Sequence, residues 1–162
     1  MSSSINKVIC TLVLVGIIGF ARAEVVNPTD KSTTQQQSTT QSAPTTAQMN
    51  QAISYIQATV SRFSNVKPAL LTELNSVPVT SAGLIKAIAL LGQTDIAVKS
   101  RQEILNGVNV TLGANFAKSL PQPSGIVQTL LNTARSNLAP ADRSNIIGKL
   151  YNDKGLDANT LM

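Results

Sequence analysis

The sequence predicts an all-α protein, in which a compact bundle of about six or seven short helices follows a signal peptide and a disordered segment. After residue 46, apolar residues recur at the i, i+3 and i+4 spacing of a helix face. Pro and Gly divide this pattern into short stretches. Aromatic residues make up only 3% of the chain. The core must therefore be built from Ala, Leu, Ile and Val, which pack well helix on helix.

The first 23 residues have the parts of a secretory signal peptide. Lys7 supplies a positive charge, residues 8–20 form an apolar run, and Ala21-Arg22-Ala23 matches the A-x-A cleavage pattern. A helix of this run would rise about 20 Å, which is less than the roughly 30 Å hydrocarbon core of a bilayer. We therefore expect cleavage near Ala23, export to the periplasm or the medium, and no permanent membrane anchor.

Residues 24–46 are rich in Ser, Thr and Gln and include Pro28 and Pro44. They carry too little apolar surface to offset the entropy lost on ordering, which predicts a disordered tether. The remaining residues, 47–162, are expected to form the helical domain. A segment of roughly 115 residues is long enough for one domain with one core and too short for two.

The first two helices are expected close together. The apolar spacing predicts a helix over residues 47–63, with Thr45 or Thr46 capping its start. A shorter helix follows over about 67–75, where Pro68 suits the first turn because that position needs no N–H donor.

The most apolar part of the mature chain is residues 82–91, in which Lys86 is the one charge. Thr80 or Ser81 can cap its start, and Gly92 is expected to end it. A helix that is apolar on nearly every face is normally buried at the centre of a domain. The alternative is a surface for a protein partner, a membrane or an apolar ligand. Four residues are the candidates for that surface: Leu84, Ile85, Ile88 and Leu91.

The last part of the chain predicts three or four more helices. Thr94 caps a helix that is expected to end near Asn106-Gly107. Residues 108–120 fit both a helix stripe and a strand alternation, and we favour a helix because their neighbours are helical. Beyond a proline-rich break, helices are expected over 124–138 and 140–151. We find no convincing sequence repeat.

The chain lacks the side chains of the common catalytic and metal sites. It contains no histidine, and its single cysteine, Cys10, lies in the predicted signal. These absences argue against Ser-His and Cys-His pairs, thiol chemistry and zinc thiolate sites in the mature protein. Ser64-Asn65-Val66-Lys67 matches the S-x-x-K motif, but Pro68 disfavours the helical turn that this motif requires. We interpret that string as a polar junction and expect no enzyme activity, no metal and no cofactor.

The charge of the mature chain also restricts its partners. Without Lys7 and Arg22, 11 basic and eight acidic residues remain, a net charge of +3. The basic residues are scattered and form no stripe with interleaved aromatics, so we expect no nucleic-acid binding.

These observations favour an exported, non-enzymatic helical interaction or scaffold protein of the bacterial cell envelope. A signal peptide, a polar spacer and a helical domain together resemble the layout of accessory components of Gram-negative secretion machines, although no residue motif carries this resemblance. The expected partners are envelope proteins, and self-association is left open. One alternative is a secreted or periplasmic carrier of an apolar small ligand or lipid, with the helix over 82–91 lining its cavity. Another is a membrane-active effector, which Lys86 alone would attract only weakly to anionic lipid.

Overall fold

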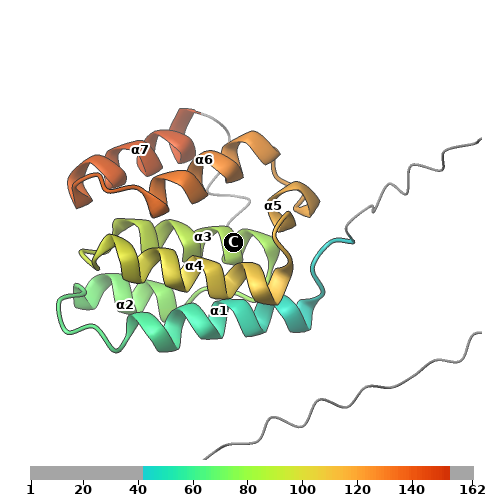
Figure 1. The fold of residues 1–162 in the computed structure, drawn as a ribbon, viewed down its shortest axis with the longest axis horizontal. Coiled ribbons are helices and arrows are strands. Elements are labelled where there is room, and N and C mark those ends of the chain that lie inside the picture. Colours follow the sequence, from blue (N-terminus) through green and yellow to red (C-terminus); the bar gives the residue numbers. More distant parts are fainter. Residues whose placement is uncertain (1–41, 154–162) are drawn as a thin grey trace, which may run out of the picture. The chain divides into compact units, whose positions relative to one another are not determined.

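The computed structural model describes residues 42–153, and all regular structure in this range is helical (Figure 1). The predicted all-α fold is therefore confirmed. The predicted signal peptide, most of the predicted tether and residues 154–162 lie outside the described residues. The helices within the described range are α1 (Thr46–Val60), α2 (Pro68–Asn75), α3 (Ser81–Gln93), α4 (Val98–Leu112), α5 (Phe116–Ser119), α6 (Ser124–Arg135) and α7 (Pro140–Asp153).

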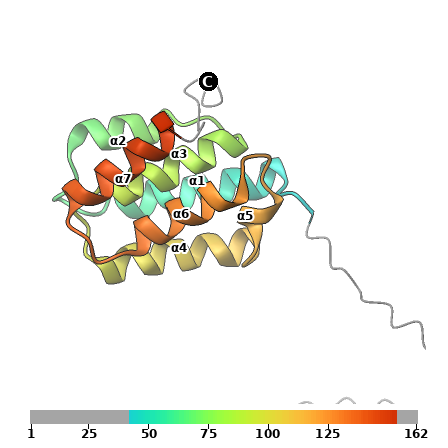
Figure 2. The same cartoon turned by 90° about the horizontal axis from the view of Figure 1, so that it is seen from above.

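Six of these helices form three hairpins that stack in layers. The pairs are α1–α2, α3–α4 and α6–α7, and the α3–α4 hairpin lies between the other two (Figures 1 and 2). Helix α3 packs against α1 and α2 on one side and against α6 and α7 on the other. The turns inside the three hairpins all lie at the same end of the stack, on the left in Figure 1. We call this end the turn end.

Helix α3 is the centre of the core, as its composition predicts. Its only residues that are not fully buried are Ser81, Lys86 and Gln93. Because α3 has helices on both sides, it can bury apolar side chains around nearly its whole circumference. The Thr80 hydroxyl accepts a hydrogen bond from the Gly83 N–H at 3.0 Å and so caps the start of the helix.

The predicted start and end of the fourth helix are both wrong. Helix α4 begins at Val98 after the N-cap Ala97, whereas Thr94 is the C-cap of α3. It then continues through Gly107 to Leu112. Gly107 serves the contact between α4 and α1. A Cβ atom at this position would lie 2.5 Å from Cε1 of the Tyr55 ring, so a larger residue here would have to displace that ring. The glycine that we interpreted as the end of the helix is therefore a site of close packing inside it.

The ambiguous residues 108–120 are divided by the true stop. The helical interpretation is confirmed for their first part, which completes α4, and the short helix α5 follows after a break. Gly113 ends α4 with a φ of 89°, a backbone conformation that favours glycine. Two other helices also end earlier than expected, α1 at Val60 and α6 at Arg135.

The structure contains a repeat that the sequence alone does not make convincing. We call α3, α4 and their turn the first unit, and α6, α7 and their turn the second unit. Positions 82–111 of the first unit correspond to the positions 42 residues later, 124–153, in the second. The turn reads Thr94-Asp95-Ile96-Ala97 in the first unit and Ser136-Asn137-Leu138-Ala139 in the second. The identical pairs in the described range are Gly83 with Gly125, Ala97 with Ala139, Arg101 with Arg143, and Ile104 with Ile146.

Arg101, on α4 of the first unit, is buried and reaches the end of helix α6 in the second unit. Its Nε donates to the Ala134 carbonyl at 2.9 Å, and its Nη2 donates to the Ser136 carbonyl at 2.6 Å. Its Nη1 donates to the carbonyl of Ile96, five residues before it in its own unit. The side chain thus satisfies carbonyls that the end of a helix leaves without partners.

Arg143, on α7 of the second unit, makes the same bonds in the opposite direction. Its Nε donates to the Gly92 carbonyl at 2.7 Å, and its Nη2 donates to the Thr94 carbonyl at 2.6 Å, both at the end of α3. Its Nη1 donates to the Leu138 carbonyl, again five residues before it. Every acceptor is therefore shifted by the same 42 positions. Such an exchange is what an approximate two-fold axis between the units produces.

Candidate functional site

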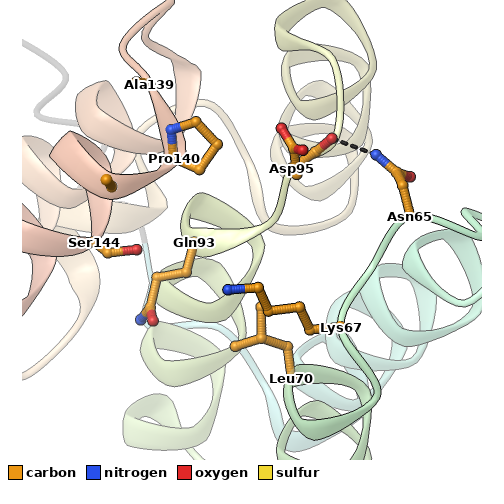
Figure 3. Close-up of a pocket in the computed structure, with 9 residues that line it drawn as sticks. Asn65, Lys67, Leu70, Gln93, Asp95, Ala139, Pro140 and Ser144 are labelled. Atoms are coloured by element: carbon orange, nitrogen blue, oxygen red, sulfur yellow. Dashed lines mark hydrogen bonds between the residues drawn. The ribbon is translucent and has the colours of Figure 1, made fainter.

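A cavity of about 380 Å³ opens at the turn end, where residues from all three hairpins meet. We call it the turn-end cleft (Figure 3). Its lining residues are Asn65, Lys67 and Leu70 from the first hairpin, Gln93 and Asp95 from the first unit, and Ala139, Pro140, Ala141 and Ser144 from the second unit. Its volume lies at the lower end of the range of small-ligand sites.

The polar groups of the turn-end cleft come from opposite walls. The Lys67 ammonium approaches the Gln93 side chain, which extends towards Ser144 on helix α7 (Figure 3). Lys67 precedes Pro68, the first residue of α2, and its extended backbone directs it away from the helix. Two residues before Lys67, the Asn65 amide donates to the Asp95 carbonyl and so fixes the turn of the first hairpin against that of the first unit.

Two buried arginines, Arg101 and Arg143, bind backbone carbonyls next to residues of the turn-end cleft. Each is only 2% exposed, and their hydrogen bonds go to backbone carbonyls rather than to a carboxylate. Burial lowers the pKa of both guanidinium groups, and the neighbouring Arg143 lowers the pKa of Arg101 further, whereas the carboxylate of Asp95 raises both. Both side chains remain cations at neutral pH. They hold the turns of the two units in fixed positions and place positive charge near the cleft.

A second hollow of about 200 Å³ lies beside the cleft and shares Gln93 with it. Its wall includes an ion pair in which Lys86 Nζ lies 3.0 Å from Glu73 Oε1, between two partly exposed side chains. Its wall also includes Tyr151, whose hydroxyl is buried and has no hydrogen-bond partner among the described residues. Burial raises the pKa of Tyr151, and the charge of Glu73 raises it further.

The turn-end cleft contains donors and acceptors without a catalytic pairing. Its polar groups are an ammonium, a carboxylate, a hydroxyl and two carboxamides, and no hydrogen bond joins the Ser144 hydroxyl to a base within the described range. Nor do the described residues contain a group of three or more side chains suited to a metal ion. This arrangement suits recognition of a polar group.

The residues of the S-x-x-K string do not form the catalytic motif, but two of them line the turn-end cleft. Ser64 and Asn65 lie in a turn, and Lys67 has the extended angles φ −60° and ψ 132°. The single helical turn that would place the lysine beside the serine hydroxyl is therefore absent here. Asn65 and Lys67 instead line the turn-end cleft.

The structure places the four candidate residues of α3 in the core. Leu84, Ile85, Ile88 and Leu91 each have no exposed surface. None of the four lines the turn-end cleft or the second hollow. Helix α3 is therefore a buried central helix in this fold, and these four residues do not form an exposed surface on it.

Sequence reasoning missed the residues that line the cleft, although the turns carry a signal. Ser64-Asn65-Val66, Thr94-Asp95-Ile96 and Ser136-Asn137-Leu138 share one pattern: a hydroxyl residue, then Asn or Asp, then an aliphatic residue. All three stand at the turn between the helices of a hairpin. A search for this pattern, rather than for catalytic motifs, would have located the turn end.

No family model, curated protein or solved structure matches this chain. The turn-end cleft therefore has to be interpreted from its own geometry. None of the helices in the described range is long and apolar enough to cross a membrane.

Proposed function

We propose that this chain is an exported, non-enzymatic interaction or scaffold protein of the bacterial cell envelope, and that the turn-end cleft is where it contacts a protein partner. The observation that carries this proposal is a preformed polar cleft whose walls are held by buried arginines. A rigid site loses little conformational entropy on binding, which favours recognition. The predicted signal peptide and tether support a place in the envelope, where an accessory role in a secretion or assembly machine fits this layout.

The alternative role, a carrier of an apolar ligand or lipid, gains no support from the described residues. The apolar side chains that would have lined its cavity pack against other helices in the core. The turn-end cleft has polar groups from three hairpins on its walls, which suits a polar partner better than a lipid tail.

The proposal predicts a partner that contacts the turn end in cells. A photo-crosslinking amino acid at Lys67 should give discrete cross-linked envelope proteins in the native host. The same amino acid at Val110, which is 87% exposed on α4, is the matched control. Cross-links that are identical at the two positions, or absent from both, would contradict the proposal.

Export is tested separately by the mass of the protein in the periplasm or medium. We expect a mature form that begins near Glu24, as the predicted cleavage site requires. A full-length chain retained in the cytoplasm would contradict the envelope location.

A further inference from the structure

The turn-end cleft lies beside two positions at which the two units carry different side chains. Ser144 of the second unit corresponds to Gln102 of the first, and Gln93 of the first unit corresponds to Arg135 of the second. The approximate two-fold relation therefore predicts that Gln102 faces Arg135 as Ser144 faces Gln93. The structure agrees, since Gln93 and Ser144 line the same cleft.

At the end of α6, the protein satisfies the last helix carbonyl with its own Gln102 side chain. The Gln102 Nε2 donates to the Arg135 carbonyl at 3.1 Å, across the end of α6. This bond adds a carboxamide to the carbonyls already held by Arg101 at the same helix end. The last carbonyl of α6 is satisfied as a result.

At the end of α3, the corresponding side chain is too short to make that bond. Ser144 has a hydroxymethyl group where Gln102 has a carboxamide on a longer stem. Within residues 42–153, no donor reaches the Gln93 carbonyl at the end of α3. Ser144 and Gln93 both line the turn-end cleft, which is about 380 Å³ in volume and so has room for a carboxamide side chain.

The groups around this space match those of a carboxamide. A carboxamide offers two N–H donors and one carbonyl acceptor. The Gln93 carbonyl and the Asp95 carboxylate can accept from the donors, and the Lys67 ammonium can donate to the acceptor. All three residues line the cleft. A polar group that leaves water loses little when each of its atoms is paired in this way.

From this comparison we infer that the turn-end cleft binds the side-chain carboxamide of a glutamine presented by a protein partner, in the place that Gln102 fills in the other unit. The inference rests on the proposed function, because it names the chemistry by which the partner is recognised. The cleft is open to solvent at Lys67 and Asp95, which are exposed, so a side chain on a partner's surface can enter it.

The test uses blocked glutamine, N-acetyl-L-glutamine amide, titrated into the isotope-labelled protein and followed by amide NMR shifts. We expect weak but saturable shifts confined to the residues of the turn-end cleft. Blocked leucine is the matched apolar probe and should give none. Shifts that do not saturate, that lie elsewhere or that leucine reproduces would overturn the inference.

The variant Ser144→Gln gives the second unit the side chain that the first unit already has. Its glutamine should bond to the Gln93 carbonyl and fill the cleft, which would weaken binding of the probe at least tenfold. Its unfolding midpoint should equal or exceed that of the unaltered protein, because the residue lies on a helix and adds a hydrogen bond. Unchanged binding by a folded Ser144→Gln protein would overturn the inference.

The double variant Gln102→Ser, Ser144→Gln exchanges the two side chains and tests whether Lys67 and Asp95 are needed. The shifts at Gln93 should be lost, and no comparable shifts should arise at Arg135, because Asn137 corresponds to Asp95 and Lys67 lies outside both units. Shifts that stay at Gln93 would contradict our inference that the short side chain of Ser144 leaves the binding place open. If the titrations fail but cross-linking at Lys67 succeeds, only the glutamine inference is contradicted. If the cross-links are lost but the titrations succeed, the proposed protein partner is contradicted.

Discussion

The first and second units carry the same arginine and the same turn in different surroundings. The first unit lies between two hairpins, so its turn residue Ile96 is 1% exposed, whereas the corresponding Leu138 of the second unit, in an outer layer, is 43% exposed. The arginines themselves do not differ in this way, since both are buried and both bind three carbonyls. The arginine bonds that hold the two units together are therefore the same in both units, whereas the burial of the turn residue depends on the layer in which its unit lies.

The largest effect should come from the arginines, which are the part that the units share. Arg101→Met or Arg143→Met would leave three carbonyls without their donor, and each buried unpaired acceptor costs about 1–3 kcal/mol. We expect each variant to lower the free energy of unfolding by at least about 3 kcal/mol, measured by urea denaturation. The double variant should cost less than the sum, because either change already loosens the contact between the units.

Arg62→Met provides the control for this comparison, since Arg62 is exposed and outside both units. Its effect should stay within about 0.5 kcal/mol. If Arg101→Met and Arg143→Met were equally mild, the exchange of arginines would contribute little to stability. If only one were severe, the two units would not be equivalent in holding the fold.

The next effect should separate the units. Ile96→Ala removes a fully buried side chain and should cost about 2–5 kcal/mol, through the lost apolar contact and the cavity left behind. Leu138→Ala changes the corresponding side chain at an exposed position and should cost less than about 1 kcal/mol. Thermal or urea unfolding of the two variants measures this difference. Equal costs would show that place in the stack does not govern these two positions.

A smaller effect is expected at the glycines that begin the units. A Cβ atom on Gly83 would lie 1.8 Å from the Pro78 carbonyl oxygen, whereas one on Gly125 would meet nothing within 4 Å. Gly83→Ala should therefore destabilise the protein by about 1–3 kcal/mol, because backbone has to move. Gly125→Ala should stabilise it by about 0.4–1 kcal/mol, because alanine has fewer unfolded conformations to lose. Effects of the same sign in both variants would refute this contrast.

The smallest effect concerns Tyr151 of the second unit, which corresponds to Asn109 of the first. The pKa of the tyrosine is raised from its ordinary value of 10.0 in the folded state. The folded protein thus holds this proton more tightly than the unfolded chain does. Its contribution to stability is complete below pH 10 and is lost as the pH rises above that value.

Tyr151→Phe should make the free energy of unfolding less dependent on pH above 10, because the titrating group is gone. At neutral pH the variant should be no less stable, since the hydroxyl it removes has no partner. Tyr55→Phe is the control, as Tyr55 is 39% exposed. The same pH profile for Tyr151→Phe and for the unaltered protein would contradict this account.

Much of the fold follows from local sequence patterns. The helix starts at Pro68 and Pro140 were predictable because proline at a first helical position loses no hydrogen bond. The central place of α3 was predictable because only a helix covered on all sides can bury so many apolar residues. The helix ends were less accessible to this reasoning. Gly107 looked like a helix stop, but it lies inside α4, where it packs closely against Tyr55.

The candidate site depended on tertiary structure for a similar reason. The cleft residues Lys67, Asp95 and Ser144 are polar residues far apart in sequence, and the pattern shared by the three turns marks the turns without showing that they lie at one end of the stack. Their shared place results from three hairpins that turn at the same end of the stack.

The sequence by itself determined that this protein is helical and that α3 is central, because composition and apolar spacing act locally. It also shows that the chain has no histidine and a single cysteine, Cys10. Tertiary structure alone decided that Arg101 and Arg143 exchange hydrogen bonds between two similar units, and that Ser144 leaves open the place that Gln102 closes. These relations join residues more than 30 positions apart. Their physical basis is that the last carbonyls of a helix need donors from outside that helix, which only the packing of one unit on the other can reveal.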